Sequence, residues 1–214
     1  YRKRAISRKR FLSRAQNNRI ANKILIISIM QDLINNNANA TENQLKSNRL
    51  LRIEYAESIR NKDILIIIEN TWYDHNISAI FRTVEAAGLK NIIVAGNVQK
   101  KKIRHDHIDF KCSKFLDIQY FEQTDAAIMF AKNQGYKIFA TFISKTAQNF
   151  WACDFSGKVA IIFGAERDGV SDTAANLADY HIWIPTFGLT RSLNVSVSAG
   201  IIIYDILKRK FLEY

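Results

Sequence analysis

Short polar side chains and a glycine lie in a loop between two apolar stretches, within the segment from Ile184 to Val197. Such a loop offers free backbone N–H groups near a helix start, so it can bind a ligand through its backbone. Ser192 and Asn194 are the polar side chains that stand nearest the second apolar stretch. Alternatively, these two residues only cap and satisfy the start of a buried helix.

The residues at the two ends of this loop predict where the neighbouring strand ends and where the following helix begins. The apolar run from Ile182 to Ile184 is stopped by Pro185, the only proline of the chain, which fixes φ and removes a backbone donor. Ser192 is predicted to be the N-cap of a helix over residues 192–210. Because Leu193 to Leu207 is almost wholly apolar, we expect this helix to be buried on most sides.

Two further segments have a comparable arrangement of strand, turn and helix. Residues 64–68 form an apolar run, and in the helix predicted over residues 76–88 helical spacing places Arg82 away from the apolar face. Residues 161–170 read as a buried strand that enters a turn with Gly164 and Gly169 at its ends and opens a helix. Each segment alone is ordinary in an α/β protein.

Together and in this order, the three segments resemble the signature motifs of the SPOUT superfamily of RNA methyltransferases. Within it they resemble the SpoU/TrmH branch of ribose 2'-O-methyltransferases, and most of all its tRNA enzymes, which methylate the guanosine at position 18 of the D-loop. The resemblance runs from about Asp63 to Tyr204. It is carried by His75-Asn76 before Ser78-Ala79-Ile80, by Ala140-Thr141 before the second motif, and by Ser192-Leu193-Asn194-Val195-Ser196-Val197.

From Asp63 onward, strand-like and helix-like patterns alternate. Continuous apolar strands separated by helices predict an α/β fold with a parallel sheet covered on both faces. The expected strands are residues 64–68, 91–95, 137–141, 159–163 and 181–184, and the expected helices are 76–88, 126–134, 171–178 and 192–210. The pattern alone predicts an open sheet, because chains almost never knot. The family resemblance instead implies a C-terminal deep trefoil knot.

The resemblance also implies a cofactor, S-adenosylmethionine, and the residues that hold it. No Gly-x-Gly-x-x-Gly follows the first strand, so an ordinary dinucleotide site is not supported. The positions that match the family's cofactor-binding residues are Thr141, Phe142, Phe163, Gly164, Gly169, Ile184, Thr186, Gly188, Leu193 and Val195. The positions that match its catalytic residues are Arg82, Asn76, Glu166, Ser192 and Asn194.

Arg82 is physically awkward as a general base, because a guanidinium keeps its proton in proteins. We therefore hypothesise that Arg82 binds the phosphate beside the target ribose, and that the hydroxyl proton leaves to phosphate, water or a transiently neutral arginine. The alternative is a surface arginine paired with Glu85. Glu166 could likewise only stabilise its loop through the helix dipole.

The net charge of +11 indicates a polyanionic partner, and the excess lies in residues 1–23, which contain nine basic residues and no acid. We expect residues 1–60 to be a basic helical extension that binds RNA, and residues 61–214 to be the catalytic domain. A disordered tail and an organellar transit peptide are the alternatives for the arm. The candidate RNA-binding residues are Arg2, Arg4, Arg8, Lys9, Arg10, Arg14, Arg19 and, in the third motif, Arg191.

Other chemistry has little support in the sequence. Cys112 and Cys153 match no metal-ligand spacing and fit reduced cysteines of a cytosolic protein. His105-Asp106-His107 has no third ligand at a regular spacing and belongs to a basic loop that could touch RNA. The apolar stretch over residues 21–33 is too short to span a bilayer. We expect no metal, no membrane segment and a cytoplasmic location, or an organellar one if the arm is a transit peptide.

Three functions remain open. The first is 2'-O-methylation of tRNA, and the second is the same reaction on ribosomal RNA, whose enzymes often carry a globular N-terminal domain that residues 1–60 fit poorly. The third is a catalytically silent RNA-binding protein, which the intact motif residues argue against. The resemblance further implies a homodimer with the site near the subunit boundary.

Overall fold

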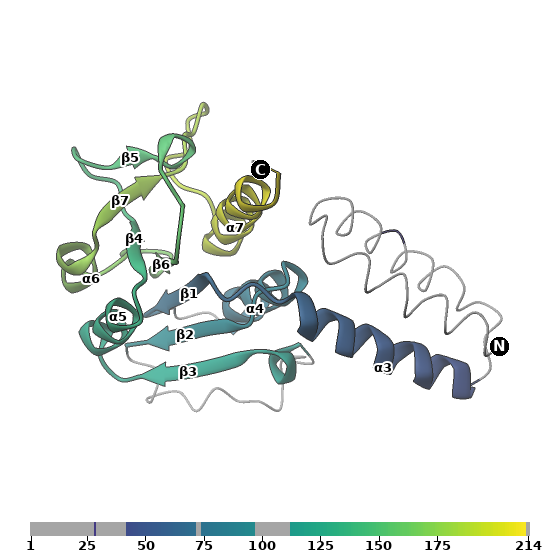
Figure 1. Ribbon diagram of the computed structural model, residues 1–214. Helices are drawn as coiled ribbons and strands as arrows, with labels where there is room; N and C mark the ends of the chain where they lie inside the picture. Colours follow the sequence, from purple (N-terminus) through teal and green to yellow (C-terminus); the bar gives the residue numbers. More distant parts are fainter. Residues whose placement is uncertain (1–27, 29–41, 72–73, 97–111, 213–214) are drawn as a thin grey trace. The chain divides into compact units, whose positions relative to one another are not determined.

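The computed structural model describes residues 28, 42–71, 74–96 and 112–212 (Figure 1). The basic arm, with its candidate RNA-binding residues, and the loop with His105-Asp106-His107 lie outside these residues. The chain divides into two compact units, residues 1–59 with 211–214 and residues 60–210. In the first unit the described element is α3 (Glu42–Ile59), a helix within the extension that was expected to be helical.

The second unit is built on a parallel sheet of seven strands in the order β3-β2-β1-β6-β4-β7-β5. The prediction of a parallel α/β fold is confirmed, and the five expected strands are present. The strands are β1 (Ile64–Glu69), β2 (Asn91–Ala95), β3 (Asp117–Phe121), β4 (Lys137–Thr141), β5 (Gln148–Asn149), β6 (Val159–Phe163) and β7 (Tyr180–Trp183).

The sheet is covered on both faces. Every residue of β1 and β6 is buried, and Ile66 pairs with Ile161 in the central register. Leu65 and Ile67 face α5 (Thr124–Asn133) and α6 (Asp172–Leu177), whereas Figure 1 shows α4 (Asp74–Ala86) and α7 (Val195–Leu212) on the side away from them. Burial on both faces explains the unbroken apolar runs.

Two strands, β3 and β5, were not predicted from the sequence, and both lie at the edges of the sheet. β3 has no fully buried residue, and β5 is only two residues long. Edge strands bury less than central ones, so their sequences need not be apolar. Without an apolar run they carry no signal that a reading of periodicity can detect.

Helix α7 begins later than predicted. Its first residue is Val195, and the capping residue is Asn194, whose Oδ1 accepts a hydrogen bond of 2.9 Å from the backbone N–H of Ser196. The assignment of Ser192 as the N-cap is therefore wrong. A cap must precede the first helical turn by one residue, and Asn fills this position as well as Ser does.

One face of α7 contradicts the expectation that this helix is buried on most sides. Val197, Ile201 and Tyr204 are exposed and recur at helical spacing, so they form one apolar stripe. The opposite face is buried through residues such as Ile203 and Ile206. A helix that is apolar all round can thus leave one side uncovered by the rest of the described chain.

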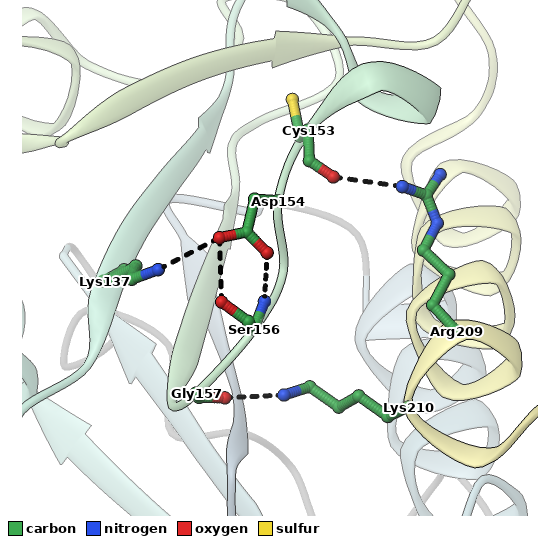
Figure 2. A network of polar contacts seen from close by, with 7 residues as sticks. All are labelled: Lys137, Cys153, Asp154, Ser156, Gly157, Arg209 and Lys210. Carbon is green, nitrogen blue, oxygen red and sulfur yellow. Dashed lines mark hydrogen bonds and ion pairs between the residues drawn. The ribbon is translucent and has the colours of Figure 1, made fainter. Parts of the chain in front are cut away.

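The last turns of α7 are fastened to the chain that follows β5 (Figure 2). Arg209 donates to the backbone carbonyls of Cys153 at 3.0 Å and Phe150 at 3.4 Å. Its guanidinium also pairs with Asp205 at 2.6 Å and lies 5.5 Å from the centre of the Phe155 ring. Burial raises the pKa of the neighbouring Cys153 thiol, which Arg209 only partly offsets.

A second contact continues this attachment toward the start of β6. Lys210 donates to the carbonyl of Gly157 at 2.5 Å. Asp154 accepts hydrogen bonds from the backbone N–H and the hydroxyl of Ser156, which hold its pKa below the usual value, and it pairs with Lys137 at 3.5 Å. Figure 2 shows the turn held between β4 and α7 by these contacts.

Replacing Arg209 tests this attachment. We expect Arg209→Ala to lower the free energy of unfolding by about 1–3 kcal/mol, because two buried carbonyls lose a charged donor. The measurement is urea unfolding followed by circular dichroism. Lys208→Ala, an exposed lysine of the same helix turn, should change the free energy by less than about 0.5 kcal/mol. Equal effects of the two substitutions would contradict the role of Arg209.

Candidate active site

A buried asparagine side chain connects the three segments that the sequence singled out. Asn76 lies in the first turn of α4 and is 2% exposed. Its Nδ2 donates a hydrogen bond to Oε1 of Glu166, and its Oδ1 accepts one of 3.1 Å from Nδ2 of Asn194. These partners are 90 and 118 residues away along the chain, so the fold unites three distant segments at one amide.

Glu166 is presented by a tight loop that two glycines make possible. Ala165 and Gly169 exchange two backbone hydrogen bonds of 2.9 Å each, and Gly169 has a φ of +69°. A Cβ on Gly164 would lie 2.1 Å from the carbonyl carbon and oxygen of Gly169, so a side chain at Gly164 would force the loop open. The second carboxylate oxygen of Glu166, Oε2, is buried and has no partner among the described residues. A buried acceptor of this kind needs a donor, which the described residues do not supply.

Asn194 has two tasks at once. Its Oδ1 accepts from the backbone N–H of Ser196 and, at 2.6 Å, from the Ser196 hydroxyl, while its Nδ2 is the group that donates to Asn76. The capping interpretation therefore holds for this residue, and the bond to Asn76 brings it together with a second predicted site residue, whose shared catalytic role stays a prediction. Because Asn194 is the first residue before α7, the link to Asn76 also sets where that helix begins.

A buried carboxylate that sequence reasoning missed forms a second link between the first two segments. Glu69, at the end of β1, is fully buried. Its Oε1 accepts from the hydroxyls of Thr124 at 2.7 Å and Ser171 at 2.5 Å, and its Oε2 accepts from the Ser171 backbone N–H at 2.8 Å. Ser171 also caps α6, directly after the Glu166 loop. The available signal was an acid that ends an otherwise unbroken isoleucine-rich run.

Arg82 and Ser192 do not join this network. Arg82 is exposed on α4 and has no hydrogen bond or salt bridge to any described residue. Glu85, the expected partner in the alternative interpretation, instead lies 4.0 Å from Arg60. The surface salt bridge with Glu85 is therefore absent, and the guanidinium of Arg82 is available to an anion. Ser192 is exposed in the loop before α7.

Five of the residues predicted to bind a cofactor, Thr141, Phe142, Phe163, Gly164 and Ile184, lie at the carboxyl ends of three adjacent strands, β4, β6 and β7. Thr141 ends β4 and donates to the carbonyl of Ile162 at 2.9 Å, and Phe163 ends β6 beside Gly164. The backbone N–H of Phe142 donates a hydrogen bond to the carbonyl of Ile182 in β7. Ligands in α/β proteins commonly bind at this edge of a sheet. Ile184 and Thr186 are half-buried, Gly188 and Leu193 are exposed, and Val195 is buried, whereas Arg191, which was predicted to bind RNA, is exposed.

Two other kinds of site find no support in the described part of the chain. Among these residues no three histidine, cysteine, aspartate or glutamate side chains are grouped as a metal would require. No helix in the same ranges is long and apolar enough to cross a membrane.

Residues 63–204 match the model of the SpoU rRNA Methylase family. The chain belongs to this family. It is 33% identical to a tRNA (guanosine(18)-2'-O)-methyltransferase of Aquifex aeolicus. The 162 aligned residues cover 76% of this chain and 77% of the relative. The same activity is named for an Escherichia coli relative that is 29% identical over 71% of this chain and 66% of its own.

Solved structures agree with this family assignment. The A. aeolicus TrmH/SpoU tRNA modifying enzyme superposes with a TM-score of 0.70 at 33% identity, over 77% of this chain and 84% of that one. The family expected from the three motifs is thereby confirmed, and so is the α/β architecture. The shared segment includes Asn76, Glu166 and Asn194.

Changing the central amide to a carboxylate tests the network. In Asn76→Asp, two carboxylates would face each other, and repulsion would raise the pKa of one of them above its unfolded value of about 4. The folded state would then bind more protons than the unfolded state, so the variant should lose stability as pH rises from about 4 toward 8. Urea unfolding at pH 5 and pH 8 measures this loss relative to the wild type.

The matched control is Asn133→Asp, which makes the same change at an exposed position. Its stability difference from the wild type should vary little between the two pH values, because an exposed carboxylate is well screened. A pH-independent loss in Asn76→Asp would show that its carboxylate does not face Glu166.

Proposed function

We propose that this protein transfers a methyl group from S-adenosylmethionine to the ribose 2'-hydroxyl of tRNA, at guanosine 18 of the D-loop. The observation that carries the proposal is the link of Asn76 to Glu166 and Asn194. It joins the three motif segments in a chain that is 33% identical to a tRNA (guanosine(18)-2'-O)-methyltransferase. A tRNA substrate also fits a cytoplasmic enzyme.

The proposed cofactor site is the carboxyl edge of β6, β4 and β7. Gly164 lets the loop return closely at Gly169, which places Glu166 beside this edge, and the buried Oε2 of Glu166 can accept a hydrogen bond. Apolar walls from Phe163 and Val195 suit an adenine ring and a thioether chain. When bound, S-adenosylmethionine supplies an electrophilic sulfonium methyl group.

The chain's own residues would then position the ribose. Arg82 keeps its proton, and its planar guanidinium matches a phosphate oxygen pair, so we assign it to the phosphate beside the target nucleotide. This contact orients the 2'-hydroxyl for in-line attack on the methyl carbon. Methyl transfer would break the C–S bond of the bound cofactor as the O–C bond forms, and the hydroxyl proton would leave to a phosphate oxygen or to water.

We extend the proposal to the assembly and to the threading of the chain. The exposed stripe of Val197, Ile201 and Tyr204 on α7 is suited to packing against a second copy, which supports a homodimer. β6 lies between β1 and β4, β7 lies between β4 and β5, and the end of α7 is fastened to the turn before β6. This order of elements supports a C-terminal trefoil knot. We also assign the basic arm to tRNA phosphates.

Methyl transfer by Arg82 variants tests the proposal. Incubated with labelled S-adenosylmethionine and either unmodified tRNA or ribosomal RNA, the wild type should methylate tRNA in preference to ribosomal RNA. Arg82→Ala should lower kcat at least about 100-fold, as is typical when a group that orients or stabilises the transition state is removed. Arg82→Lys should retain part of the activity, because it keeps the charge but loses the planar pair of donors.

Lys158→Ala is the control. Lys158 lies at the amino end of β6, away from the carboxyl ends of the strands, and donates to the carbonyl of Gln134. This variant should be as active as the wild type. Near-normal turnover by Arg82→Ala would remove Arg82 from the site. Labelling confined to ribosomal RNA would overturn the proposed substrate.

A further inference from the structure

Two large aromatic side chains lie exposed and stacked on each other at the end of the sheet. Trp151 belongs to the short helix η5 (Phe150–Ala152), and Phe187 belongs to the loop between β7 and α7. Their rings are nearly parallel, with centroids 6.5 Å apart and an interplanar angle of 20°. Trp151 is 49% exposed and Phe187 is 89% exposed. Rings this exposed add little to the core, and adjoining exposed aromatic side chains are typical of a surface that binds a partner.

The two rings are mounted on anchored segments. The backbone N–H of Trp151 donates to Oδ1 of Asn149 at 3.0 Å, and the adjacent Phe150 is fully buried. Asn149 pairs with Trp183 of β7, only four residues before Phe187. The loop that carries Phe187 projects beyond β5 and β7 in Figure 1. Trp151 is thus held at the end of the sheet, and the ring of Phe187 lies against it.

The segments that carry the two rings also supply positive charge. Residues 141–153 and 182–204, the segments that carry the two rings, contain Lys145 and Arg191 but no aspartate or glutamate. Both cations are exposed. Exposed aromatic rings together with nearby cations in the sequence are typical of surfaces that bind single-stranded nucleic acid, since the rings stack on bases and the cations attract phosphates.

We propose that the Trp151–Phe187 pair stacks an unpaired base of the RNA substrate. The base would lie on the open face of Phe187 and extend the existing stack, with Arg191 near its phosphate. The site is tied to the candidate active site, because the loop with Phe187 continues to Asn194, which bonds to Asn76. This inference rests on the proposed function, which makes RNA the substrate.

Substitutions at Phe187 test the inference through affinity for unmodified tRNA, measured by filter binding at fixed salt. Phe187→Ala should raise the Kd about tenfold, the typical cost of losing one base–aromatic stack. Phe187→Tyr keeps a ring and should bind as the wild type does. Leu189→Ala is the matched control, because Leu189 is fully exposed in the same loop but has no ring. It too should bind as the wild type does.

Two further measurements separate this inference from its alternatives. S-adenosylmethionine affinity by calorimetry and molecular mass by light scattering should be equal for all four proteins. Equal weakening of RNA binding by Phe187→Ala and Leu189→Ala, with a reduced mass, would make the patch a contact between copies and overturn the inference. Unchanged RNA binding by Phe187→Ala in a protein that still methylates tRNA would overturn it while the proposed function stands. A wild type that methylates no RNA would overturn both.

Discussion

The arrangement of this protein depends on the side-chain amide of Asn76, a group that has a donor and an acceptor on one rigid plane. The donor serves the carboxylate of Glu166 and the acceptor serves the amide of Asn194, so one buried side chain satisfies two distant partners. An aspartate has no donor when ionised, and an apolar residue would leave both partners unsatisfied. The amide therefore favours the arrangement in which the Glu166 loop and the start of α7 both contact α4. Glu69 forms a second link, from the end of β1 to Ser171 after the Glu166 loop.

The sheet explains how segments so far apart in sequence come within reach of one amide. β6 pairs with β1 on one side and with β4 on the other, so the chain that leaves β6 through Gly164 emerges beside the end of β1. The helix α4 follows β1 after a short connection and carries Asn76 in its first turn. Gly164 then permits the close return of the loop at Gly169, which no larger residue would allow. Parallel pairing and one glycine thus determine where Glu166 lies.

Much of this could be predicted from the sequence, and the failures have identifiable causes. Apolar runs predicted the buried strands, and helical spacing predicted the helix α4. The edge strands β3 and β5 bury too few side chains to have an apolar run. The helix cap was placed on Ser192 because hydroxyl and amide caps are alike in sequence, and only the contact with Ser196 distinguishes Asn194. Glu69 was overlooked, since its partners come from Thr124 and Ser171, far along the chain. Cofactor, knot and dimer came from the family resemblance, because no periodicity encodes them.

The central claim is that Asn76 couples Glu166 to Asn194, which are not bonded to each other in the described network. The direct measurement is a double-mutant cycle of unfolding free energies for Glu166→Ala and Asn194→Ala, made once with Asn76 present and once in an Asn76→Ala background. The account predicts a coupling of about 0.5–1 kcal/mol or more with Asn76 and additivity without it. Additive losses in both backgrounds would contradict the account.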